Sequence, residues 1–115
     1  TRVRIAEGSD EVYLLLNDRW MNPSDTVARH ECMFEVKLAR KQLGIRDNKW
    51  HELTVSWDLN QKNPVARIQV DGKKRNLRLN LKRKTLHGIS YAHFMACPAK
   101  ENPGIEVEWV KASKK

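Results

Sequence analysis

The chain lacks the features that mark several common classes of protein. It has no run of about eighteen apolar residues, so the sequence predicts no membrane span. Its five glycines form no phosphate-binding loop, and there is no Cys-x-x-Cys pair for zinc or redox chemistry. The four histidines do not recur at the spacing of metal ligands. These absences argue against nucleotide-hydrolysing, redox and zinc-binding functions.

Cysteine is scarce, with only Cys32 and Cys97 in the chain. Two thiols do not make a disulfide framework. The two residues could pair if the fold brings their strands together. We favour two buried free thiols, because cysteine behaves as a small hydrophobic residue.

Charge is the most pronounced feature of the composition. The 115 residues include 22 Lys and Arg against 14 Asp and Glu, which gives a formal net charge of +8. The length suits a single domain over residues 1–115. A surface this basic attracts phosphate, sulfate or anionic lipid headgroups without selecting among them.

Apolar residues alternate with polar ones along most of the chain. Trp50–Asp58 and Val65–Val70 are predicted to be neighbouring strands, and Asp71-Gly72 turns the chain into a third. Further strands are predicted over residues 2–5, 11–17, 33–38, 89–96 and 105–109. Residues 39–45 fit one helical turn or a loop. The pattern therefore predicts an all-β fold.

We expect an antiparallel β-sandwich, with a small barrel of the oligonucleotide-binding kind as the alternative. The alternating positions predict a core that contains Trp50, Leu53, Val55, Trp57, Ile68, Val70, Leu77, Leu79, Ile105, Val107 and Trp109. Such a core is feasible for a chain of this size.

Two segments carry a resemblance to a known superfamily. A strand opened by Trp50-His51 ends in Trp57-Asp58, and the next strand ends in Val-Asp-Gly-Lys at residues 70–73. This pair resembles the central hairpin of laminin G and concanavalin A-like jelly rolls. The resemblance implies a jelly-roll sandwich in which both strands share one sheet. The chain is short for that fold, so we expect a minimal or truncated version.

A basic cluster follows this hairpin. It contains Lys73, Lys74, Arg75, Arg78, Lys82, Arg83 and Lys84. Alternation places Arg78 and Lys82 on one solvent face, where a row of cations could hold sulfated, heparin-like polysaccharide or a nucleic acid backbone. The alternative is a solvated sheet face whose charges discourage edge pairing. No aromatic residue interleaves the cluster, so nucleic acid is the less expected partner.

A second candidate site is a sugar site in the segment after residue 17. Its residues would be Trp20, Asn22, Asp25 and Arg29, because an exposed ring can stack on a sugar while polar groups bind hydroxyls. Asp18, Asn22 and Asp25 could instead supply oxygen ligands to calcium. The structural alternative is a capped turn with Trp20 in the core.

Glu106 and Glu108 are predicted to lie on one face of the last strand. Retaining glycosidases need two carboxyl groups roughly 5 Å apart. The sandwich glycosidases that this strand resembles carry a further acid, where this chain has Trp109, Val110 and Lys111. We therefore expect charge pairing with a basic neighbouring strand and no catalytic residues.

The resemblance implies a function as well as a fold. It implies a non-catalytic, lectin-like accessory module of a larger secreted or cell-surface protein, with carbohydrate or sulfated polysaccharide as its partner. The alternative is a structural domain that packs against the other domains of that protein.

Overall fold

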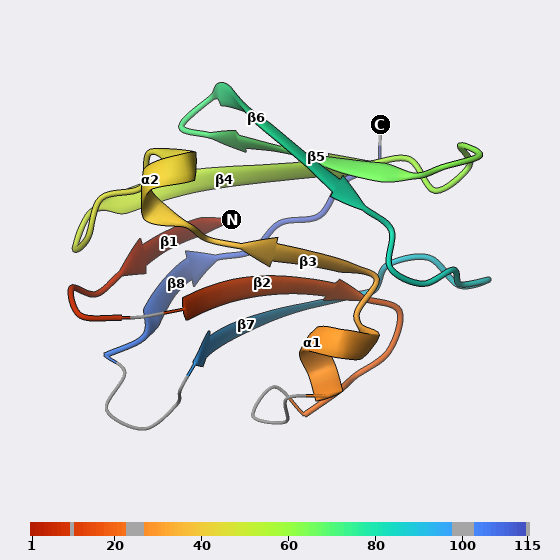
Figure 1. Cartoon of the computed structure of the whole chain (residues 1–115), viewed down its shortest axis with the longest axis horizontal. Helices are drawn as coiled ribbons and strands as arrows, with labels where there is room; N and C mark the ends of the chain where they lie inside the picture. Colours follow the sequence, from red (N-terminus) through yellow and green to blue (C-terminus); the bar gives the residue numbers. More distant parts are fainter. Residues whose placement is uncertain (10, 23–26, 98–102, 115) are drawn as a thin grey trace.

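The computed structural model describes residues 1–9, 11–22, 27–97 and 103–114. Within these ranges the chain forms eight strands and two short helices (Figure 1). In order they are β1 (Arg2–Ile5), β2 (Glu11–Asn17), α1 (Val27–Glu31), β3 (Phe34–Lys37), α2 (Arg40–Leu43), β4 (Trp50–Trp57), β5 (Val65–Val70), β6 (Lys73–Asn80), β7 (Tyr91–Cys97) and β8 (Ile105–Trp109). Neither of these helices is long and apolar enough to cross a membrane.

The strands form two antiparallel sheets. The five-stranded sheet has the order β6-β5-β4-β1-β8, and the three-stranded sheet has the order β3-β2-β7. Within each sheet, the neighbouring strands pair in the antiparallel direction. The all-β prediction is confirmed, and two separate sheets replace the closed barrel of the alternative prediction. The predicted Trp-His and Val-Asp-Gly strands are β4 and β5, and they do lie side by side in one sheet.

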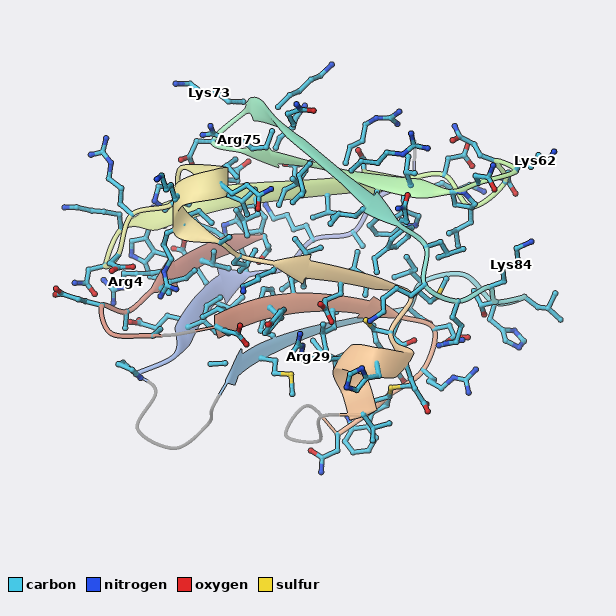
Figure 2. All side chains as sticks on the ribbon, viewed as in Figure 1. Arg4, Arg29, Lys62, Lys73, Arg75 and Lys84 are labelled. Atoms are coloured by element: carbon cyan, nitrogen blue, oxygen red, sulfur yellow. The ribbon has the colours of Figure 1, made fainter. Side chains whose placement is uncertain are left out.

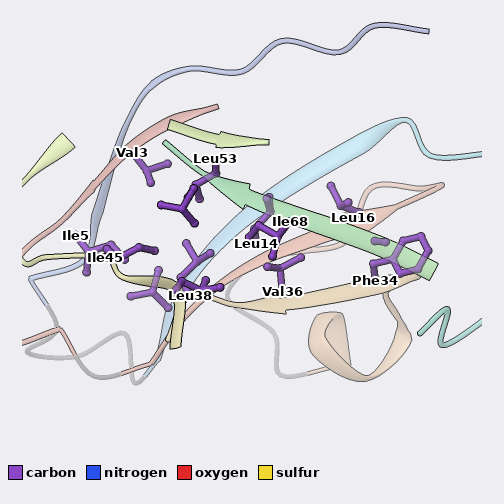
Figure 3. Packing of buried hydrophobic residues seen from close by; sticks show 14 of the residues in the cluster. Val3, Ile5, Leu14, Leu16, Phe34, Val36, Leu38, Ile45, Leu53 and Ile68 are labelled. Atoms are coloured by element: carbon purple, nitrogen blue, oxygen red, sulfur yellow. The ribbon is translucent and has the colours of Figure 1, made fainter. Parts of the chain in front are cut away.

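The main core lies between the two sheets (Figure 3). The five-stranded sheet contributes Val3, Ile5, Leu53, Ala66, Ile68 and Val70, and the three-stranded sheet contributes Val12, Leu14, Leu16, Phe34 and Val36. Leu43 of α2 is fully buried in the same core, and the helix ends at Gly44 with a left-handed φ of 68°. The single helical turn that residues 39–45 allow is therefore formed.

The predicted core is only partly correct. Leu53, Ile68 and Val70 are buried, but Trp57 is 37% exposed and Val107 is 38% exposed. Trp57 is the last residue of β4 and lies five positions beyond Glu52, the last β4 residue in the ladder with β1. Trp50 has the opposite parity to Leu53, so its ring lies on the outer face between the guanidinium groups of Arg2 and Arg4, at 5.1 and 4.9 Å.

The hairpin between β5 and β6 turns as the sequence predicts. Asp71 and Gly72 both have positive φ, at 51° and 78°, which suits the tight turn that the twist of a hairpin favours. The Asp71 carboxylate lies 2.7 Å from Nδ1 of His51 and accepts a 2.9 Å hydrogen bond from the Glu52 amide. The Arg46 amide donates to Nε2 of His51, so the ring proton is on Nδ1 and is donated to Asp71. His51 thus has a structural role that ties the start of β4 to the hairpin turn.

Helix α1 covers part of the outer face of the three-stranded sheet. It forms a second small cluster of Tyr13, Leu15, Ala28, Cys32 and Met95. This cover explains why β2 is buried on both faces, as its continuous apolar run predicts. Cys32 is a buried free thiol, as we expect from the sequence, and burial raises its pKa. The side chain of Cys97 lies outside the described residues.

Candidate polyanion-binding groove

An open basic groove lies where β6 ends. It has a volume of about 500 Å³ and runs between the β4–β5 loop and the segment that follows β6. Its lining consists of Lys62, Asn63, Pro64, Arg78, Asn80, Leu81, Lys82, Arg83 and Lys84. This lining includes five cations but no carboxylate and no aromatic ring. Figure 2 shows Lys62 and Lys84 at the same end of the molecule.

The structure divides the basic cluster of the sequence into two parts. Arg78, Lys82, Arg83 and Lys84 line the groove. Lys73, Lys74 and Arg75 lie at the other end of β6, and Figure 2 places Lys73 and Arg75 far from Lys84. Five residues of strand separate Lys73 from Arg78, or roughly 17 Å.

Lys62 is a groove residue that the sequence cluster does not contain. It lies in the β4–β5 loop, and antiparallel pairing of β5 with β6 places Val65 opposite Asn80. The residues just before β5 must therefore lie beside those just after β6. The predicted hairpin already implied this neighbourhood, because the start of one antiparallel strand lies beside the end of its partner.

Arg83 is held in place by a buried acidic partner. Its guanidinium donates to both oxygens of Asp18, to the side chain of Asn17 and, at 2.8 Å, to the carbonyl of Glu31. The Asp18 side chain is only 2% exposed and also accepts bonds from Arg19 and Thr85. The bonds from Arg83, followed by those from Arg19 and Thr85, hold the pKa of Asp18 far below its usual range.

Lys82 is also engaged with the protein. Its amide donates to the carbonyl of Met33 at 2.8 Å, and its ammonium bonds the carbonyl of Arg29 and lies 3.5 Å from Glu35. Lys82 therefore differs from the free solvent-facing cation that alternation predicts, because β6 already ends at Asn80. Lys82 and Arg83 fix the shape of the groove.

The other three cations of the groove are available to a ligand. Lys62, Arg78 and Lys84 are exposed, and none of them has a carboxylate partner within the part of the chain that the structure describes. Such charges on a concave surface concentrate anions from solution. The groove thus combines a fixed frame with three uncompensated positive charges.

The structure describes three of the four residues of the predicted sugar site. Trp20 is 65% exposed, which contradicts the alternative of a ring folded into the core. Arg29 lies over the ring of Tyr13 at 4.0 Å and pairs with Glu35 at 3.4 Å. Asn22 is exposed, and Asp25 lies outside the described residues.

The calcium alternative is not supported at Asp18. Both of its oxygens accept bonds from arginine side chains, which leaves no free negative charge for a cation. Among the residues with a described structure, no group of three or more acidic, histidine or cysteine side chains could hold a metal ion.

Glu106 and Glu108 pair with arginines of β1. Arg4 donates two bonds of 2.8 Å to the two oxygens of Glu106, and Arg2 pairs with Glu108. The cross-strand pairing that the sequence predicts is confirmed. Each carboxylate is neutralised on the open face of the five-stranded sheet.

Neither a protein-family model, nor a curated protein, nor a solved structure matches this chain. The function is therefore inferred from the groove itself.

Proposed function

We propose that this chain is a non-catalytic module that binds an anionic polysaccharide, of which sulfated chains are the best fit, in the basic groove. The observation that carries the proposal is a groove whose described lining has five cations and no carboxylate. Three of those cations, Lys62, Arg78 and Lys84, have no acidic partner in the described chain, so an incoming anion need not displace an existing ion pair.

A polysaccharide is favoured over a nucleic acid by what the groove is made of. Single-stranded nucleic acids are held by aromatic rings on which bases stack, and none of the described residues that line this groove carries such a ring. Its polar lining of Asn63 and Asn80 can bond sugar hydroxyls instead.

The finer fold assignment belongs to the same proposal. We propose a short jelly roll of the concanavalin A-like kind, in a module of a secreted or cell-surface protein. The two-sheet architecture and the pairing of β4 with β5 support it. A shared fold is an association and not a mechanism, so the groove remains the main support.

Trp20 supports a second candidate, a separate contact with an uncharged sugar ring. Its side chain is 65% exposed, which is unusual for the largest apolar side chain. Stacking on a sugar face would use this surface.

Heparin affinity chromatography tests the groove proposal. We expect the double variant Lys62→Gln and Lys84→Gln to elute at clearly lower salt than wild type. It loses two contacts between lysine and the anionic ligand. The slope of log affinity against log salt should fall by about two, since each contact displaces roughly one condensed counterion.

The matched control is Lys73→Gln combined with Lys74→Gln, which removes the same charge from the other end of β6. We expect this variant to elute close to wild type. A wild-type chain that fails to bind at low salt would overturn the proposal. If the elution of the two double variants shifts to the same lower salt, heparin binding depends on net charge and not on the groove.

A further inference from the structure

Two arginines face each other on the open side of the five-stranded sheet. Arg67 of β5 is the direct partner of Arg78 of β6, and Ser56 of β4 is the partner of Arg67 on its other side. All three side chains are exposed. The three residues form one row across three strands and point away from the core, since Ala66, Ile68 and Leu79 point into it.

This arrangement opposes like charges. Residues directly opposite each other on antiparallel strands have Cβ atoms about 5 Å apart, and like charges at that distance destabilise a sheet. Elsewhere on the same face Arg2 and Arg4 are neutralised by Glu108 and Glu106. Neither Arg67 nor Arg78 has a carboxylate partner within the described ranges.

We propose that Arg67 and Arg78 together bind one sulfate or phosphate group of the ligand, with the Ser56 hydroxyl as a third donor. A tetrahedral oxyanion offers several acceptor oxygens, and two guanidinium forks can each donate to a pair of them. The anion also removes the repulsion between the two arginines. Binding of the anion therefore also removes a repulsion that destabilises the free protein.

This inference rests on the proposed function, because Arg78 belongs both to the pair and to the groove. The ligand then continues from the groove over β6 onto the sheet face at Arg67. Adjacent strands are about 4.8 Å apart, so the path is within the reach of a single saccharide chain. A carboxylate has only two oxygens, enough for one fork, whereas a sulfate group has three free oxygens that both forks can share. The ligand is therefore assigned as a sulfated polysaccharide and not one with carboxylates alone.

The test compares Arg67→Gln with Arg46→Gln. Arg46 is an exposed arginine in the loop before β4, so the control removes the same charge far from the pair. We expect Arg67→Gln to weaken heparin binding by roughly tenfold, the loss for a bond to a charged group. Arg46→Gln should stay within about twofold of wild type. Inorganic sulfate should raise the melting temperature of Arg46→Gln more than that of Arg67→Gln.

A third variant, Arg67→Lys, keeps the charge but loses the planar fork. We expect its preference for heparin over hyaluronan, which carries carboxylates but no sulfate, to be smaller than that of wild type, although the groove cations still favour the more highly charged heparin. An unchanged preference would contradict the oxyanion site.

The two proposals can fail separately. If the groove variant at Lys62 and Lys84 loses heparin binding while Arg67→Gln behaves like Arg46→Gln, the arginine pair is wrong and the groove stands. If Arg67→Gln loses its response to sulfate while the groove variant at Lys62 and Lys84 keeps the heparin binding of wild type, the pair stands and the groove is wrong.

Discussion

Truncation of Phe34 to alanine is expected to lower the free energy of unfolding by about 3–5 kcal/mol, the usual cost of removing a buried aromatic side chain. Phe34 is fully buried, pairs with Leu16 across the three-stranded sheet and lies in the main core (Figure 3). Its removal leaves a cavity between two sheets whose backbones are held by their ladders. The core therefore has little freedom to collapse around the cavity.

Urea unfolding of the wild type and the variant measures this loss. The matched control is Leu86→Ala, another apolar truncation at a side chain that is 99% exposed. We expect the control to change stability by less than about 0.5 kcal/mol. A loss below 1 kcal/mol for Phe34→Ala would show that the two sheets do not close on this side chain.

Replacement of Asp18 by alanine is expected to be the most damaging change to a charged residue. The carboxylate is almost fully enclosed and compensates Arg83, so its loss leaves a half-buried guanidinium without its counter-charge. A charge stranded in this way costs far more than the pair contributes. The segment that follows β6 loses its anchor, and we expect a clearly lower melting temperature together with weaker heparin binding.

The same carboxylate gives the effect a pH dependence with a defined sign. Hydrogen bonds from Arg83 lower the pKa of folded Asp18 below its ordinary value of 3.8. The stabilisation is then fully present above about pH 4 and is lost as the pH falls below it. The stability gap between wild type and Asp18→Ala should shrink steadily as the pH falls from about 4 to 3, where an unfolded aspartate becomes protonated while the folded carboxylate stays ionised.

Arg19→Ala is the control, because Arg19 also bonds Asp18 but is 62% exposed. We expect this variant to remain within about 0.5 kcal/mol of wild type. A gap for Asp18→Ala that stays constant down to pH 3 would mean that the carboxylate contributes by packing and not by charge.

The strands of this fold were accessible from local pattern, but helix α1 and the arrangement of the strands were not. Alternation predicts β1 and β8 at their observed bounds, and the turn at Asp71-Gly72 depends only on those two residues. Which strands become neighbours depends on contacts between distant segments. Alternation places Leu53 and Trp57 on the same face of β4, but it does not show that Leu53 is buried and Trp57 partly exposed.

The candidate site was also only partly predictable from the local sequence pattern. A run of cations after β5 is visible in the sequence, and it correctly places Arg78 and Lys84 on an exposed basic surface. It does not show that Arg83 is paired with Asp18, because the two residues are 65 positions apart. Nor does it show that Arg67 faces Arg78, which depends on an irregular register between β5 and β6.

The order of the five-stranded sheet also sets how this chain can fold. β4 and β5 are joined by a loop over residues 58–64, and β5 and β6 by a two-residue turn, so the three strands can form as a local meander. β1 pairs with both β4 and β8, and the bond between Arg2 and Glu108 spans 106 positions. Closing a contact of that length has a large entropic cost, and folds rich in such contacts fold slowly. We therefore expect the meander to be protected from hydrogen exchange early in refolding and the β1–β8 ladder last. Simultaneous protection of both would argue against this order.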